Sequence, residues 1–76
     1  MNAPLAATED LIYSVQDGIA RITFNRPQAR NALTFAMYEQ MASICEAINQ
    51  ARSIRALILT GAGDKAFASG TDISQF

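Results

Sequence analysis

Apolar and polar side chains alternate in two short stretches near the start of the chain. Residues 11–16 and residues 19–24 each place an apolar side chain at every second position. Asp17-Gly18 lies between the two stretches, and this pair favours the two-residue turn that joins antiparallel strands. The alternation and the turn together predict a β-hairpin over residues 11–24.

A different period follows the hairpin. Pro27 cannot donate to a strand ladder, so residues 28–33 are predicted as a loop, with Thr34 as the N-cap of a helix. Apolar residues then recur every three or four positions, which predicts an amphipathic helix ending near Arg52 or Ser53. The residues of this stripe, interpreted as core rather than as a metal or redox site, are Met37, Met41, Ile44, Cys45, Ile48 and Ala51.

A nearly unbroken apolar run comes after the helix. Residues 54–60 include Ala56-Leu57-Ile58-Leu59, a pattern typical of a strand that is covered on both faces in a parallel sheet. A strand, a helix and a second strand in this order predict a βαβ crossover. Because the chain offers one helix, we expect further chain or another subunit to cover the second face.

These elements predict a single α/β unit. Residues 1–10 are expected to form a flexible leader, and residues 11–76 are expected to form part of one domain. Asp72-Ile73-Ser74-Gln75-Phe76 looks like the start of a helix and carries no stop signal. The domain is therefore expected to be incomplete at its C-terminal end.

Composition narrows the classes of function. The chain has 76 residues, half of them hydrophobic, and a net charge of −1. The hydrophobic share argues against a disordered tail, and the charge balance gives no reason to expect nucleic acid or a membrane as partner. His is absent, which excludes a His-based triad or His metal site within these residues. With Cys45 as the only cysteine and no recognisable signal peptide, the cytoplasm is the expected compartment.

Two segments after the apolar run are candidates for chemistry. Gly61-x-Gly63-x-x-Ala66 matches the dinucleotide-binding fingerprint. Gly70 lies too close to allow the long helix that this fingerprint opens, so a plain turn is the favoured interpretation and a nucleotide-binding module is an alternative. The second segment, residues 67–73, is rich in small residues, which let a ligand press against the backbone. Taken alone, it is equally consistent with an ordinary strand-to-helix loop, in which Asp72 is the candidate N-cap of the helix that begins there.

Three stretches of the chain together resemble the crotonase (enoyl-CoA hydratase/isomerase) family. Residues 22–27 (ITFNRP), followed by Asn31-Ala32-Leu33, resemble the opening strand and first loop of the family. Residues 56–61 (ALILTG) resemble its next strand, and residues 65–73 (KAFASGTDI) resemble its acyl-CoA loop. The order and spacing of the stretches agree over residues 11–76.

This resemblance implies both a fold and a chemistry. The implied fold is the N-terminal portion of a crotonase-like ββα spiral, in a protein that forms a homo-oligomer, either a trimer or a hexamer. Family members bind an acyl-CoA thioester, a substrate rather than a cofactor, and stabilise an enolate-type oxyanion with two backbone N–H groups. Thr71 matches the residue that donates the first N–H. Many members have Ala there, so the hydroxyl and methyl of Thr71 are expected to reshape the acyl pocket.

The resemblance also implies which residues contact CoA. Ser69, Asp72 and Ile73 match positions at its adenine and pantetheine end. Arg30 matches a position that is often basic near the CoA phosphates, and a solvated loop charge is the alternative. Arg26 is expected to serve the structure of its own loop. The complete set assigned to CoA is Arg30, Ala32, Ser69, Gly70, Thr71, Asp72 and Ile73; no metal ligand is assigned.

The remaining catalytic groups of the family lie further along its sequence. They are the second oxyanion donor and the acids that move protons; Glu39 and Glu46, on the wet face of the helix, are poor candidates for the latter. We therefore expect residues 1–76 alone to be inactive, and the full-length protein to be a lyase or isomerase of fatty-acid or related acyl-CoA metabolism. The alternative is a non-catalytic member that binds acyl-CoA or assembles with partners. An acid in the later loops would separate the two.

Overall fold

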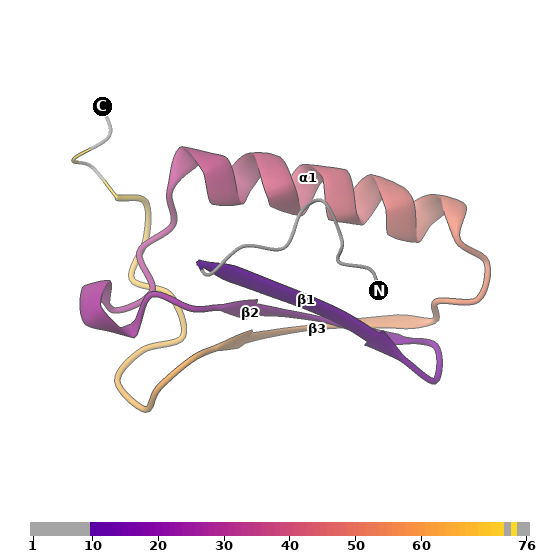
Figure 1. Ribbon diagram of the computed structural model, residues 1–76, viewed down its shortest axis with the longest axis horizontal. Coiled ribbons are helices and arrows are strands. Elements are labelled where there is room, and N and C mark those ends of the chain that lie inside the picture. The colour runs from indigo at the N-terminus through magenta and orange to yellow at the C-terminus, as the bar shows by residue number, and fades with distance from the viewer. Residues whose placement is uncertain (1–9, 73, 75–76) are drawn as a thin grey trace.

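The chain folds as a three-stranded mixed sheet with one long helix across one of its faces (Figure 1). The computed structural model describes residues 10–72 and residue 74, so residues 1–9 of the predicted leader lie outside the described residues. The strand order in the sheet is β1-β2-β3. The elements in chain order are β1 (Leu11–Gln16), β2 (Ile19–Phe24), the 3-10 helix η1 (Pro27–Ala29), α1 (Phe35–Gln50) and β3 (Ala56–Gly61).

The predicted hairpin is confirmed. β1 and β2 pair antiparallel, with Leu11 opposite Phe24 and Gln16 opposite Ile19. The turn residues Asp17 and Gly18 have positive φ angles of 55° and 80°. Two consecutive positive values define the type I′ turn, whose twist matches that of the strands it joins.

The predicted crossover from strand to helix to strand is also confirmed. β3 lies parallel beside β2, with Ala20 opposite Leu57, and α1 carries the chain back between them (Figure 1). Thr34 caps the helix as predicted, because its side-chain oxygen accepts a hydrogen bond from the Met37 N–H at 3.1 Å.

The hydrophobic core lies between α1 and the sheet. Alternate side chains of a strand point to the same face, so one face of the hairpin meets one stripe of the helix. The buried residues are Leu11, Ile22, Phe24, Met37 and Ile44, with Met41, Ile48 and Leu57 among those packed against them. The prediction that Met41, Ile44 and Ile48 belong to the core is confirmed.

Two details of the helix prediction are wrong. Cys45 is exposed, because a helix turns about 100° per residue and the residue after Ile44 is carried past the edge of the packed stripe. The helix ends at Gln50 rather than near Arg52. Ala51 is the C-cap, because its backbone is already extended while its N–H still donates to carbonyl oxygens of the last helical turn.

β3 is parallel, as predicted, but the described residues leave it partly uncovered on both faces. It begins at Ala56, two residues later than predicted. Leu57 packs against the core, whereas Ile58 and Leu59 are 38% and 46% exposed. As the last strand in the sheet order, β3 also has an outer edge that no described strand pairs with.

Across residues 10–72 and 74, no helix combines the length and the apolar character needed to cross a bilayer.

Candidate functional site

Two loops meet at one edge of the sheet. The first loop (residues 25–34) follows β2, and the second loop (residues 62–72) follows β3. Because β2 and β3 are parallel, with Phe24 opposite Gly61, both loops start side by side. Every described residue that the resemblance assigns to substrate lies on one of these two loops.

Asn31 joins the two loops through its side-chain amide. The residue is fully buried, and its Nδ2 donates to the carbonyl oxygens of Ala62 at 3.0 Å and Ala66 at 2.7 Å. Its Oδ1 accepts the N–H of Arg26 at 2.8 Å. Both donors and the acceptor of the amide are thus engaged, so Asn31 fixes the position of one loop against the other.

Close packing excludes a side chain at Gly61, where the second loop begins. A Cβ atom there would overlap the carbonyl oxygen of Phe67 and lie 2.8 Å from both the Ala66 carbonyl oxygen and Asn31 Nδ2. The second loop can therefore fold back against the end of β3 only because residue 61 is glycine.

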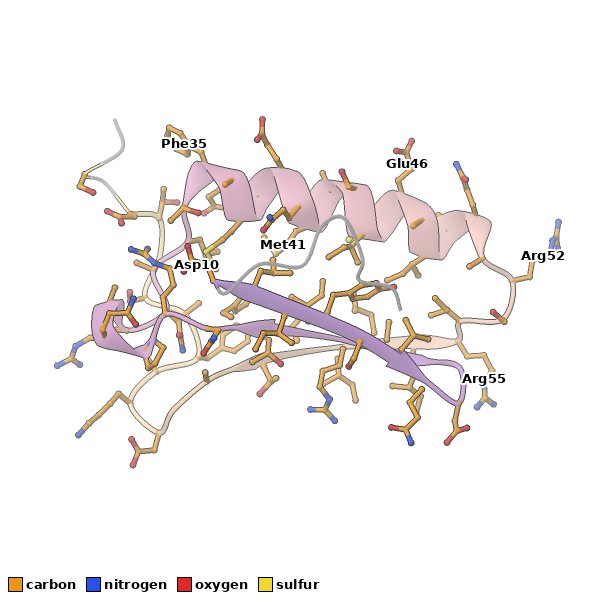
Figure 2. The ribbon with its side chains drawn as sticks, in the orientation of Figure 1. Asp10, Phe35, Met41, Glu46, Arg52 and Arg55 are labelled. Atoms are coloured by element: carbon orange, nitrogen blue, oxygen red, sulfur yellow. The ribbon has the colours of Figure 1, made fainter. Side chains whose placement is uncertain are left out.

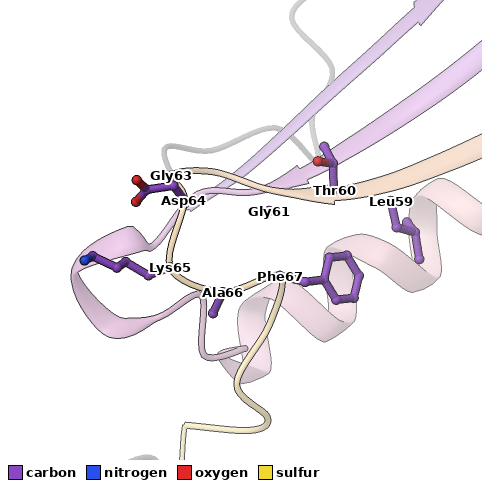
Figure 3. Close-up of a pocket in the computed structure, with 8 residues that line it drawn as sticks. All are labelled: Leu59, Thr60, Gly61, Gly63, Asp64, Lys65, Ala66 and Phe67. Carbon is purple, nitrogen blue, oxygen red and sulfur yellow. The ribbon is translucent and has the colours of Figure 1, made fainter.

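Figure 3 shows an open hollow formed where the second loop folds back. Its volume is about 420 Å³, and residues between Leu59 and Phe67 line it; Thr71 is not one of them. Residues 62–72 contain no helix. The dinucleotide fingerprint at Gly61 and Gly63 therefore lacks the helix that it should open, and the plain turn is what the structure shows.

Thr71 pairs with Leu33 in a single parallel β-bridge. The Leu33 N–H donates to the Gly70 carbonyl at 2.8 Å, and the Asp72 N–H donates to the Leu33 carbonyl at 2.9 Å. The N–H of Thr71 itself takes no part in the bridge, and it has no hydrogen-bond partner among the described residues. A donor kept for a ligand needs this arrangement, although its role in an oxyanion hole stays a prediction.

Arg26 holds the far end of the second loop. Its Nη1 donates to the Ala32 carbonyl at 2.7 Å and forms an ion pair with Asp72 Oδ2 at 3.1 Å. Asp72 Oδ1 accepts the N–H of Ser74 at 3.0 Å and its hydroxyl at 2.6 Å, as the predicted N-cap would. These bonds from Ser74, followed by the Arg26 guanidinium, lower the pKa of Asp72 below its ordinary value of 3.8.

Arg30 and Ser69 are brought to neighbouring places on the two loops. Arg30 is exposed at the end of η1, with a positive φ of 52°. Ser69 is also exposed, and its hydroxyl lies 3.5 Å from the carbonyl oxygen of Ala29. Gly70 has a φ of 113°, in the region that favours glycine, and open space lies where a side chain would project.

The other residues assigned to CoA either have a backbone group that is already hydrogen-bonded or lie outside the described residues. Ala32 is half-buried, and its carbonyl oxygen is occupied by Arg26. The Asp72 N–H is bonded to Leu33, so a contact between Asp72 and CoA needs another of its atoms. Ile73 lies outside the described residues.

Reasoning from the sequence missed a hydroxyl pair beside Thr71. The oxygen atoms Tyr38 Oη and Thr71 Oγ1 lie 2.5 Å apart. Tyr38 is in the first turn of α1, off the apolar stripe, and it is 39% exposed. An aromatic residue near a helix start that does not fit the apolar period was the available signal. The role of Asn31 was missed as well, because Asn31-Ala32-Leu33 belongs to the resemblance but no local pattern assigns a partner to the Asn31 side chain.

Comparisons with known proteins agree on one family. The family model for enoyl-CoA hydratase/isomerase matches residues 14–76. YngF of Bacillus subtilis (strain 168), a curated protein assigned provisionally to the enoyl-CoA hydratases/isomerases, is 40% identical over 68 residues. That match covers 88% of this chain and 26% of YngF.

Solved structures agree with the same family. AtuE of Pseudomonas aeruginosa is 43% identical with a TM-score of 0.80, over 88% of this chain and 26% of that chain. A carnitinyl-CoA dehydratase of Mycobacterium thermoresistibile is 39% identical with a TM-score of 0.84, over 88% and 20%. The predicted fold class, part of a crotonase-like ββα spiral, is confirmed, and the chain spans about a quarter of the length of such relatives.

Proposed function

Because the chain belongs to the enoyl-CoA hydratase/isomerase family, we propose that the full-length protein acts on an acyl-CoA thioester. The reaction is that of a lyase or isomerase, in fatty-acid or related acyl-CoA metabolism. The backbone N–H of Thr71 is proposed as one donor of an oxyanion hole. The observation that carries this proposal is the β-bridge with Leu33. The N–H groups of Leu33 and Asp72 donate in this bridge, and the Thr71 N–H has no partner among the described residues.

An oxyanion donor works by being in place before charge develops. Donors aimed at the developing charge need no reorganisation during the reaction, and losing one reduces kcat by about 100- to 1,000-fold. The contacts of Asn31 and Arg26 supply that rigidity, because they bind both ends of the second loop to the first. We place the second donor and the proton-transferring acid in the remainder of the full-length protein.

The CoA moiety is proposed to run along the two loops. Arg30 is exposed and offers a positive charge to the CoA phosphates. Ser69 and Gly70 lie beside it on the second loop, where the open space at Gly70 allows a ligand to approach the backbone. Ala32, Asp72 and Ile73 complete the proposed contacts.

Assembly and compartment are part of the same proposal. The exposed Ile58 and Leu59 on β3 present apolar surface that needs cover. The rest of the protein, in a homo-oligomer of three or six subunits, would provide it. The proposed compartment is the cytoplasm.

Replacing the Thr71 amide by an ester in the full-length protein tests the oxyanion donor directly. The change removes one N–H and keeps every side chain. We expect kcat/KM for crotonyl-CoA to fall about 100- to 1,000-fold, followed by the loss of enoyl absorbance. The same amide-to-ester change at the exposed Lys65 is the control and should leave the rate near that of the unmodified protein. An unchanged rate for the Thr71 ester would refute the assignment.

The Arg30 assignment has its own test. Replacing Arg30 by Gln is expected to raise KM for the CoA thioester, with a smaller effect at high salt because exposed charges are screened. Arg52→Gln is the matched control, since Arg52 lies past the opposite end of α1 from Phe35 (Figure 2). Tight binding of crotonyl-CoA by the full-length protein without any turnover would instead favour the non-catalytic member of the family.

A further inference from the structure

We propose that the hydroxyl pair formed by Tyr38 and Thr71 selects acyl groups that carry a hydroxyl or oxo group near the thioester. This inference rests on the proposed function, because it takes the Thr71 N–H as the donor to the thioester oxygen. The two oxygen atoms of the pair are 2.5 Å apart. One belongs to the same residue as the proposed oxyanion donor, so the pair lies beside the place where the acyl group must start.

The pair has hydrogen-bonding capacity left over. Each hydroxyl has one donor and two acceptor positions, and the contact between them uses one O–H. Whichever hydroxyl donates within the pair, the other O–H remains to be directed outward, and acceptor positions remain on both oxygens. A hydroxyl or oxo group on the ligand can engage them, whereas a hydrocarbon chain cannot.

The pair is also accessible. Tyr38 is 39% exposed and Thr71 is only half-buried, so the hydroxyls are not enclosed in the core. An apolar acyl group that displaced water would leave the outward-directed O–H without a partner, and an unsatisfied polar group is expensive to desolvate. An oxygen-bearing acyl group would satisfy them. The pair therefore favours one class of acyl-CoA through both attraction and rejection.

Tyr38→Phe in the full-length protein tests the proposal, since it removes one hydroxyl and keeps the ring. The quantity to measure is the ratio of kcat/KM for 4-hydroxycrotonyl-CoA and 4-oxo analogues to kcat/KM for crotonyl-CoA. We expect this ratio to fall about tenfold in the variant, the factor that one hydrogen bond carries. Thr71→Val should lower the same ratio, and Thr71→Ser, which keeps the hydroxyl, should preserve it.

Tyr13→Phe is the matched control, because it removes a phenol hydroxyl from a β1 residue that pairs with Ile22 in the hairpin, and it should leave the ratio unchanged. If Tyr38→Phe lowers the rates for both classes of substrate equally, or lowers neither, the selectivity inference is wrong while the proposed function stands. If the unmodified protein acts on crotonyl-CoA but rejects the oxygenated substrates, the inference is also wrong and the proposed function stands. If it neither binds nor converts any acyl-CoA, the proposed function fails and the inference falls with it.

Discussion

Arg26 and Asp72 lie 46 positions apart in the chain and form an ion pair in which Nη1 and Oδ2 are 3.1 Å apart. Partly exposed pairs contribute only about 0–1 kcal/mol to stability, and these side chains are 16% and 20% exposed. The more important consequence is geometric. Arg26 also binds the Ala32 carbonyl, so one guanidinium holds the first loop and the residue directly after Thr71.

Replacing Arg26 by Gln in the full-length protein should therefore affect activity more than stability. We expect kcat for crotonyl-CoA to fall about tenfold to 100-fold, because small misplacements of a reacting group reduce rates by such factors. The thermal midpoint should fall by only a few degrees. Arg21→Gln, a change at an exposed arginine of β2, is the control for loss of one positive charge. A variant as active as the original protein would show that Arg26 does not position Thr71.

Removing the Asn31 amide should destabilise the protein. Asn31→Ala leaves the carbonyls of Ala62 and Ala66 without their donor, and each lost buried partner costs about 1–3 kcal/mol. Ala also tolerates the φ of 59° poorly. Asn31→Gly relieves that backbone strain and still lacks the amide, so it should recover part of the loss. Denaturant unfolding of the full-length protein measures both, with the exposed Asn49→Ala as the reference.

Local sequence could not have predicted that the Asn31 side chain joins the two loops. Asp17-Gly18 and Thr34 act on their nearest neighbours, so their chemistry predicted the turn and the helix start correctly. Asn31 and Tyr38 act on residues more than 30 positions away, and no periodicity records such partners. Cys45 shows a second limit. An apolar period predicts which side of a helix is buried, but it does not show where the edge of the packed stripe lies.

The pKa of Asp72 should be measurably low. The Ser74 hydroxyl and N–H, and then Arg26, stabilise the charged carboxylate, so carboxyl NMR should give a value below 3.8. Because the folded pKa is depressed, the stabilisation is present above the ordinary pKa and is lost as the pH falls through the lowered value. Ser74→Ala should shift the pKa of Asp72 upward, and its stability difference from the original protein should shrink as the pH is lowered. A value for Asp72 above 3.8 would contradict the contacts described.

A polypeptide of residues 1–76 alone is expected not to convert crotonyl-CoA. It contains one assigned oxyanion donor and no His, and both glutamates of α1, Glu39 and Glu46, are exposed on the helix. Positioned proton transfer contributes about 100- to 10,000-fold, and an oxyanion donor contributes a comparable factor. Without the second donor and the acid, the rate should stay near background even where the thioester binds. Expression of residues 1–76, confirmation of the mass and a crotonyl-CoA absorbance assay test this. Turnover comparable to that of the full-length protein, abolished by a substitution within residues 1–76, would instead place the whole active site inside this segment.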